Sequence, residues 1–280
     1  FKKIVIADNL AGVINSVWTD IPNQSGSVLF ITAILYSFQL YTDFSGYSDM
    51  AIGVGKILGF HITKNFNYPY FSRNIAEFWR NWHMSLTSWL TDYVFIPLNI
   101  KFRNFGLFGM ILAIVINMLA VGIWHGPNWT FILFGLYNGI LFIPLILSGS
   151  FLKNKKLKTN KYGLPSLSDF LKIIGTFMFV TLGFIIFRAE DISQAYKFIL
   201  GFFDSSIFAT PYGIGMAITP LFFSILLFVF EWYSRKNRFP LSNLEFKINR
   251  PTRWAMYFAI IIAIFLFEST EQQQYIYFQF

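Results

Sequence analysis

Long apolar runs separated by short polar segments are the dominant pattern along the chain. A membrane-spanning helix needs about 20 predominantly apolar residues, and the candidate spans are residues 26–42, 44–60, 105–123, 129–147, 171–187, 218–230 and 254–267. Four glycines interrupt the second run, which favours a broken or re-entrant helix there. The pattern predicts an all-α polytopic membrane protein with about six or seven spans, and no linker divides residues 1–280 into more than one domain.

A less apolar segment between residues 70 and 97 predicts an amphipathic helix. Asn74 followed by Glu77 resembles a capping box at its start, and Pro97 marks the expected stop. The positions that would share its aromatic face are Trp79, Trp82, Leu86, Trp89 and Tyr93. Such a helix packs into the protein or lies at the membrane interface.

Composition and charge support membrane burial. The chain is 55% hydrophobic and only 13% charged, whereas a soluble domain carries about 25% charged residues. The net charge of +8 is concentrated in loops, which predicts orientation in a lipid bilayer and argues against nucleic acid as a partner. We expect the basic loops at residues 153–161 and 235–253 to be cytoplasmic, and residues 188–213 to lie on the opposite side. Counting spans then places His125 toward the extracytoplasmic side.

His125 lies between two predicted spans, in the sequence Trp124–Trp129. A titratable group at membrane depth is costly and is usually functional, although a histidine beside tryptophans at a span end can also be a simple interfacial residue. Gly126 and Pro127 interrupt the apolar run beside the imidazole, which favours a functional site.

His83 borders the aromatic face of the predicted amphipathic helix, where a structural histidine is the simpler interpretation. A metal site is a weaker alternative, because no third His or Cys follows at ligand spacing and the chain has no cysteine. Asp43 and Asp49 are carboxylates between apolar runs. Their spacing of six residues points them in different directions on a helix, so a structural role, as a helix cap or as a hydrogen-bond acceptor, is favoured over paired acid–base catalysis.

Distinctive motifs occupy residues 1–10, 41–53, 65–70, 77–86, 124–126 and 275–280. Together they resemble the bacterial membrane-bound O-acyltransferases of the alginate O-acetyltransferase type. The resemblance covers essentially the whole chain, and departs from the family pattern at Thr91 and at residues 99–101. Family members continue upstream with further spans. We therefore expect this chain, which begins at Phe1 without a methionine, to be the C-terminal part of a longer protein.

The resemblance implies specific roles for the site residues. His125 takes the place of the catalytic histidine and His83 that of a second active-site histidine, in a helical fold around a central tunnel. The residues expected to support them are Trp82, Trp124, Gly126, Asn128, Asp43 and Asp49. A neutral imidazole is well suited to take a proton from a hydroxyl group, although a transient acyl-histidine is an alternative.

The resemblance also implies substrates, partners and a location. We expect a multi-pass protein of the bacterial cytoplasmic membrane, with no tightly bound cofactor and no metal. An acyl donor such as acetyl-CoA would supply acetyl groups to an exported or cell-surface polysaccharide, with a separate extracytoplasmic acetyltransferase as partner. Within the same fold, D-alanyl transfer toward teichoic acid and peptidoglycan O-acetylation are alternatives. A transporter or channel is a further alternative, since broken helices and buried charges also mark ion paths.

Overall fold

The computed structural model describes residues 1–151, 157–242, 244–246, 248–269 and 275. Within this part of the chain every regular element is helical, which confirms the predicted all-α class. The chain forms two compact units: unit 1 comprises residues 1–63 and 200–280, and unit 2 comprises residues 64–199. The single domain and the central tunnel expected from the sequence stay predictions.

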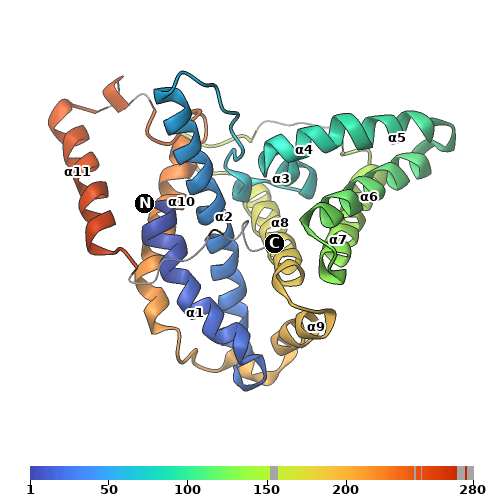
Figure 1. The fold of residues 1–280 in the computed structure, drawn as a ribbon, viewed down its shortest axis with the longest axis horizontal. Coiled ribbons are helices and arrows are strands. Elements are labelled where there is room, and N and C mark those ends of the chain that lie inside the picture. Colours follow the sequence, from blue (N-terminus) through green and yellow to red (C-terminus); the bar gives the residue numbers. More distant parts are fainter. Residues whose placement is uncertain (152–156, 243, 247, 270–274, 276–280) are drawn as a thin grey trace. The chain divides into compact units, whose positions relative to one another are not determined.

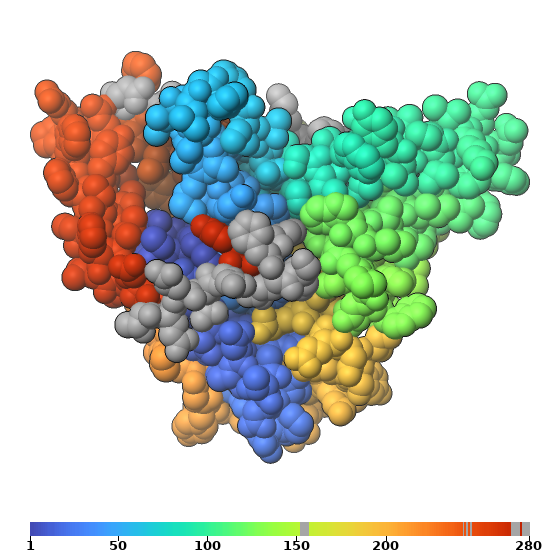
Figure 2. Space-filling view, in the orientation of Figure 1, coloured from blue at the N-terminus to red at the C-terminus, as the bar shows by residue number. Residues whose placement is uncertain are grey.

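Unit 1 is built around one long helix, α2 (Gly26–Ile57), against which the N-terminal helices pack. Its other elements are η1 (Lys2–Ala7), α1 (Asp8–Thr19), η2 (Ile21–Asn23), η6 (Gly201–Phe203), η7 (Ser205–Phe208), η8 (Gly215–Ala217), α10 (Ile218–Ser234), η9 (Leu244–Phe246) and α11 (Arg250–Leu266) (Figure 1). No residue of α11 is buried, and Figure 2 shows this helix on the surface of the unit.

The broken helix predicted for residues 44–60 is wrong, because α2 runs unbroken for 32 residues. Gly46 and Gly55 permit close packing instead of a bend. A Cβ at Gly46 would lie 3.2 Å from the backbone nitrogen of Lys3, and one at Gly55 would lie 2.9 Å from the side chain of Ile62. Neighbouring residues can approach the helix closely because these glycines have no side chain, and the helical hydrogen bonds continue through the segment.

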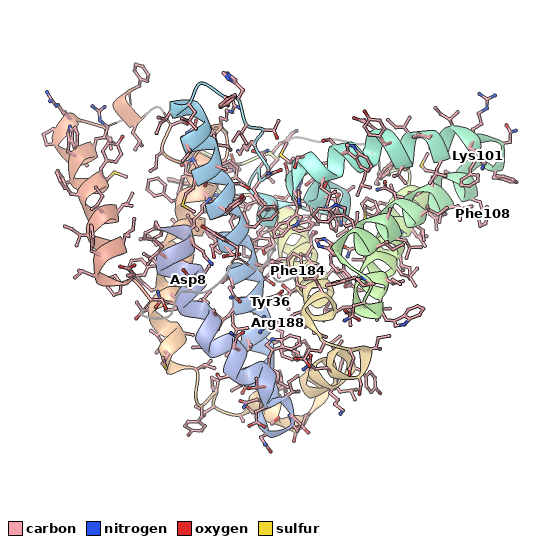
Figure 3. The ribbon with its side chains drawn as sticks, viewed as in Figure 1. Asp8, Tyr36, Lys101, Phe108, Phe184 and Arg188 are labelled. Carbon is pink, nitrogen blue, oxygen red and sulfur yellow. The ribbon has the colours of Figure 1, made fainter. Side chains whose placement is uncertain are left out.

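Unit 2 carries both candidate histidines. Its elements are η3 (Pro69–Phe71), α3 (Ile75–Asn81), α4 (Met84–Leu90), η4 (Thr91–Phe95), α5 (Ile96–Lys101), η5 (Arg103–Phe105), α6 (Gly106–His125), α7 (Trp129–Leu147), α8 (Leu167–Arg188) and α9 (Ile192–Leu200). Helices α6 and α7 form an antiparallel hairpin, and α8 packs against α7. Lys101 and Phe108, labelled in Figure 3, lie where α5 is followed by α6.

The prediction of a single amphipathic helix over residues 70–97 is also wrong, because the helix is interrupted at Trp82 and His83, between α3 and α4. Its expected start is confirmed, since the Asn74 side chain accepts a hydrogen bond from the Glu77 amide. Trp89 and Tyr93 are 55% and 68% exposed. They therefore do not share a buried face with Trp79 and Trp82. Pro97 does not stop the helix, since it lies in the first turn of α5.

Among the described residues, five helical stretches are long and apolar enough to cross a membrane. They are Gly26–Ile57, Arg103–His125, Trp129–Leu147, Leu167–Arg188 and Gly215–Ser234. The difference from the six or seven predicted spans has two causes. The first two apolar runs join in α2, and the last run forms α11, whose 17 residues are at the lower limit for crossing a bilayer. The chain is a polytopic membrane protein.

Glycines bring α6 and α7 into close contact and so fix the hairpin that ends in His125. A Cβ at Gly122 would collide with the backbone oxygen of Phe131, and one at Gly135 with that of Met118. Small residues at helix interfaces are a common way to pack helices in membranes, where backbone approach replaces the hydrophobic driving force.

Substitution of Gly122 by alanine is expected to lower the thermal stability of the detergent-solubilised protein. Relief of the collision must separate two backbones, and overpacking typically costs about 1–3 kcal/mol. Gly175→Ala in α8 is the matched control, because no atom lies within 4 Å of the position that its Cβ would occupy, and replacing a helical glycine by alanine is neutral or stabilising. Equal melting temperatures for the two variants would contradict this account of the hairpin.

Candidate active site

His125 is the last residue of α6, at the tip of the α6–α7 hairpin. The helix ends there because Gly126 adopts φ +142°, a conformation that favours glycine, and because Pro127 follows. Asn128 then caps α7, since its side-chain oxygen accepts from the Thr130 amide, and its side-chain nitrogen donates to the Glu190 carbonyl. The turn that presents His125 is thereby hydrogen-bonded to the segment that follows α8.

The imidazole of His125 is buried by phenylalanines. Its ring centroid lies 4.8 Å from that of Phe187, 6.0 Å from that of Phe131 and 6.4 Å from that of Phe134, and the residue is 8% exposed. Trp129, at the start of α7, is 70% exposed. Phe187 comes from α8, and no local pattern links it to His125.

His83 lies at the break between α3 and α4 and is also 8% exposed. Its backbone has φ 44° and ψ 54°, in the left-handed region that residues other than glycine seldom adopt. Such strain persists only where the surrounding structure enforces it, and it is frequent at functional sites. Burial lowers the pKa of His83 from 6.5 to about 4, so the imidazole is neutral at physiological pH and able to accept a proton.

The indole of Trp124 contacts both histidines. Its ring centroid lies 5.6 Å from that of His83 and 4.9 Å from that of His125, edge to face in both cases. Trp124 is itself 52% exposed. Two buried imidazoles from distant parts of the sequence therefore meet a single, partly exposed aromatic ring, and unit 2 brings together the two residues that the sequence predicts as catalytic.

Trp82 anchors the chain just before His83. It is 3% exposed, and its ring lies 5.3 Å from that of Phe78, 5.0 Å from that of Phe66 and 5.2 Å from that of Phe184, between ring centroids. Its neighbour Trp79 donates from Nε1 to the side-chain oxygen of Asn138 on α7, a contact that the sequence did not reveal. These contacts hold the α3–α4 junction against α7 and α8.

Asp43 and Asp49 belong to unit 1, where their partners are lysines of η1. Lys3 Nζ lies 2.7 Å from Asp43 Oδ1 and 2.8 Å from Asp8 Oδ1, and Lys2 Nζ lies 3.0 Å from Asp49 Oδ2. Neither carboxylate caps a helix start, because both lie within α2. Burial by itself lowers the pKa of a lysine. Here the combined attraction of the neighbouring carboxylates is the larger effect, and the pKa of both Lys2 and Lys3 is raised.

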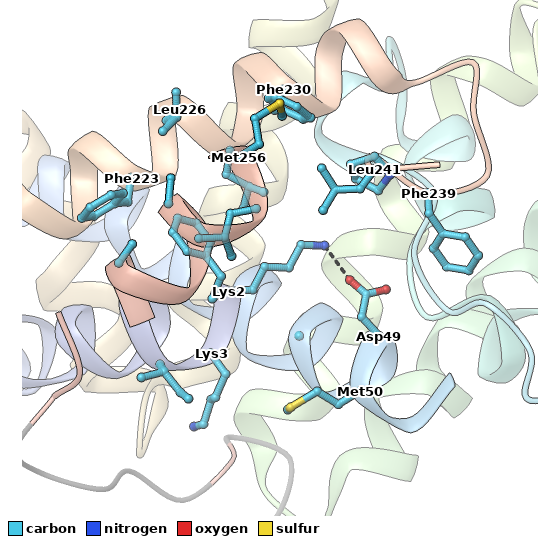
Figure 4. A pocket seen from close by; sticks show the side chains of 18 residues that line it. Lys2, Lys3, Asp49, Met50, Phe223, Leu226, Phe230, Phe239, Leu241 and Met256 are labelled. Atoms are coloured by element: carbon cyan, nitrogen blue, oxygen red, sulfur yellow. Dashed lines mark hydrogen bonds and ion pairs between the residues drawn. The ribbon is translucent and has the colours of Figure 1, made fainter. Parts of the chain in front are cut away.

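The same ion network reaches α10. Lys2 Nζ lies 3.3 Å from Glu231 Oε1, and the Tyr41 hydroxyl donates to that oxygen over 2.8 Å. Lys2 and Asp49 also line an apolar cavity of about 590 Å³ inside unit 1, whose other walls come from α2, α10 and α11 and from residues 239–241 (Figure 4). The contacts assign the two aspartates a structural role that joins η1 to its neighbours.

Within the described residues, no group of three or more His, Asp or Glu side chains is placed to hold a metal ion. Imidazole side chains can act as general bases or as nucleophiles.

Comparison with known proteins places this arrangement in a family. The sequence model of the MBOAT, membrane-bound O-acyltransferase family, matches residues 8–189, which include both histidines, Trp82, Trp124 and Asp43. The chain belongs to this family. The match confirms the resemblance inferred from the motifs.

Three relatives illustrate the range within the family. The chain is 39% identical over 197 residues to the probable alginate O-acetylase AlgI of Pseudomonas aeruginosa, covering 70% of this chain and 35% of that protein. It is 36% identical to the peptidoglycan O-acetyltransferase of Helicobacter pylori, covering 72% and 36%. It is 37% identical to the teichoic acid D-alanyltransferase of Bacillus subtilis, covering 59% and 42%. The chain thus spans little more than a third of the length of the first two relatives.

Proposed function

We propose that the full-length protein containing this chain is an O-acyltransferase of the bacterial cytoplasmic membrane. It passes an acetyl group from a cytoplasmic donor such as acetyl-CoA to a hydroxyl of an exported or cell-surface polysaccharide. The observation that carries the proposal is the pair of buried imidazoles, His83 and His125, on the ring of Trp124. This pair lies within the segment that matches the acyltransferase family.

The chemistry assigned to His125 is that of a general base. A sugar hydroxyl is almost wholly protonated at neutral pH, so its oxygen attacks the acyl carbonyl efficiently only when a base takes the proton. The attack forms a new C–O ester bond and expels the donor's leaving group, and the protonated imidazole returns its proton to that group. Phe131, Phe134 and Phe187 exclude water from the imidazole, which limits loss of the acyl group by hydrolysis.

His83 is assigned a supporting role in the same reaction. Its pKa of about 4 keeps it neutral during turnover, so it can hold the acceptor hydroxyl or the acyl carbonyl by a hydrogen bond without adding charge beside His125. Holding the reacting groups in place supplies a large share of enzymatic rate acceleration. A separate extracytoplasmic acetyltransferase is the expected partner protein, acting after this step in the modification of the glycan.

Transfer of D-alanine toward teichoic acid is the second candidate, because a teichoic acid D-alanyltransferase is 37% identical to this chain. The same base and the same ester-forming step would serve both acyl groups. Peptidoglycan O-acetylation differs from the main proposal only in the acceptor glycan.

Reconstitution of the full-length protein in lipid vesicles tests the proposal. Labelled acetyl donor and a glycan acceptor are supplied, and base-labile ester on the glycan is measured. Acetyl ester on the glycan supports the main proposal. Ester that forms only when an activated D-alanyl donor is supplied favours D-alanyl transfer instead. Movement of label across the membrane without any ester would indicate a transporter and contradict both.

A further inference from the structure

Residues 65–70 run alongside the α3–α4 junction, in a segment to which the proposed chemistry assigns no role. The backbone oxygen of Asn65 accepts from the Met84 amide over 2.9 Å. Its side-chain Oδ1 accepts both from the Ser85 amide, at 3.2 Å, and from the Ser85 hydroxyl, at 2.7 Å. One residue therefore fixes the two positions that directly follow His83.

Asn67 makes the corresponding contacts on the other side of the junction. Its amide donates to the Asn81 backbone oxygen over 3.0 Å, and its side-chain nitrogen donates to Asn81 Oδ1 over 3.1 Å. Asn81 in turn donates to the Glu77 carbonyl within α3. The end of α3 and the start of α4 are thus both hydrogen-bonded to the same short loop.

The loop also packs on the residue next to His83. Phe66 lies between Asn65 and Asn67 in the sequence, and its ring meets that of Trp82 edge to face, at 5.0 Å between centroids. Tyr70 stacks on Phe78 and contacts Trp82 at 6.1 Å. Polar and aromatic contacts from one loop therefore enclose the junction.

His83 needs such support because its backbone is strained. At φ 44° and ψ 54° a histidine adopts a conformation that its own sterics disfavour, and a junction free to relax would return it to an extended or helical conformation. The conformation decides where the imidazole points, since the helices on either side are held in place.

We propose that Asn65 is a positioning residue that holds His83 in its left-handed conformation and directs the imidazole toward Trp124 for acyl transfer. The catalytic part of this inference rests on the function proposed above. The geometric part does not, because the hydrogen bonds to Met84 and Ser85 stand whatever reaction the site performs.

Two substitutions of similar size separate positioning from packing. Asn65→Leu removes the oxygen that accepts from Ser85, whereas Asn65→Asp keeps an oxygen at that position. In the full-length protein, kcat for acyl transfer is expected to fall about a hundredfold in the leucine variant, the effect expected of a misplacement by about 1 Å, with little change in KM. The aspartate variant should recover most of the loss.

Asn160→Leu is the matched control. The side-chain oxygen of Asn160 likewise accepts two hydrogen bonds, here from the backbone amides of Tyr162 and Leu164, in a turn of unit 2. Leucine at this position also removes an oxygen that accepts two hydrogen bonds, and kcat should stay at the parental value.

Carbethoxylation of His83 by diethylpyrocarbonate, read by mass spectrometry, gives a signal that is independent of turnover. The parental residue is 8% exposed and should react slowly, the leucine variant several times faster, and the aspartate variant at close to the parental rate. Parental kcat and parental reactivity in Asn65→Leu would overturn the inference. Equal losses of activity and melting temperature in both Asn65 variants would also overturn it, because Asn65 would then act in folding alone.

The positioning role of Asn65 and the catalytic role of His83 can be tested independently. Faster carbethoxylation in Asn65→Leu, together with full activity of a His83 variant, would support positioning and refute the catalytic role of His83. Parental behaviour of Asn65→Leu beside an inactive His125 variant would refute positioning and leave the proposed function standing.

Discussion

Replacement of His125 by alanine is expected to reduce acyl transfer by at least a hundredfold, the lower limit for deletion of a general base. Because His125 ends α6 and faces three phenylalanines, the variant loses some ring packing but no helical hydrogen bond. The protein should still insert and accumulate. Ester formed on the glycan, normalised to the amount of full-length protein in the membrane, is the measurement.

Trp129→Ala is the control for this prediction. Trp129 is a larger aromatic residue four positions further along, at the start of α7, and it is 70% exposed. Its loss should leave transfer close to the parental rate. Equal activity of the His125 and Trp129 variants would mean that the imidazole has only an interfacial role.

His83→Asn is expected to lower transfer by about a hundredfold while the protein remains folded. Asparagine tolerates the left-handed conformation better than alanine does, so this variant removes the imidazole without adding backbone strain at φ 44°. The large effect follows from the loss of a neutral hydrogen-bonding group beside Trp124, which in the proposed mechanism holds a reacting group in place. Initial rates at saturating donor are the measurement.

His61→Asn is the control for His83→Asn. His61 lies exposed in a loop of unit 1, outside any element that carries the site, and its substitution should not change the rate. Normal transfer by a well-expressed His83→Asn protein would return His83 to the structural interpretation that its position in the sequence first favoured.

The helices of the apolar runs could be predicted because each carries its own signal. Residues 129–147 are expected to form a span and form α7 with the same limits. The signal at α2 is misleading, because a glycine in a helix looks the same in the sequence whether the helix bends there or a neighbour approaches. Lys3 and Ile62 decide between the two at Gly46 and Gly55.

The break at His83 could not be predicted from local periodicity. The apolar spacing of Trp79, Trp82 and Leu86 continues through it without interruption, as in a single helix. The residues on either side of the break are hydrogen-bonded to Asn65 and Asn67, about 15 to 20 residues away, and local periodicity carries no signal of such contacts. The motif that contains these asparagines stands out in the sequence through the family resemblance alone.

The two histidines could be found from the sequence, but their surroundings could not. His125 is marked by its place between two apolar runs, beside Gly126 and Pro127. The phenylalanine that lies nearest to it, Phe187, is on another helix 62 positions later (187 − 125), and only the packing of α8 against α7 brings it there. The lysine partners of Asp43 and Asp49 escape prediction for the same reason, since they lie about 40 or more residues upstream.

The proposed action of His125 on the acceptor hydroxyl is tested most directly by comparing the parental protein with His125→Gln. Glutamine keeps much of the side-chain volume and some hydrogen-bonding capacity, but it cannot take up the proton. Both proteins, purified at full length and reconstituted at equal amounts with labelled acetyl donor and glycan, are followed for the initial rate of ester formation. We predict that the glutamine variant forms ester at less than about one hundredth of the parental rate, and a rate close to the parental one would contradict the assignment of the active site.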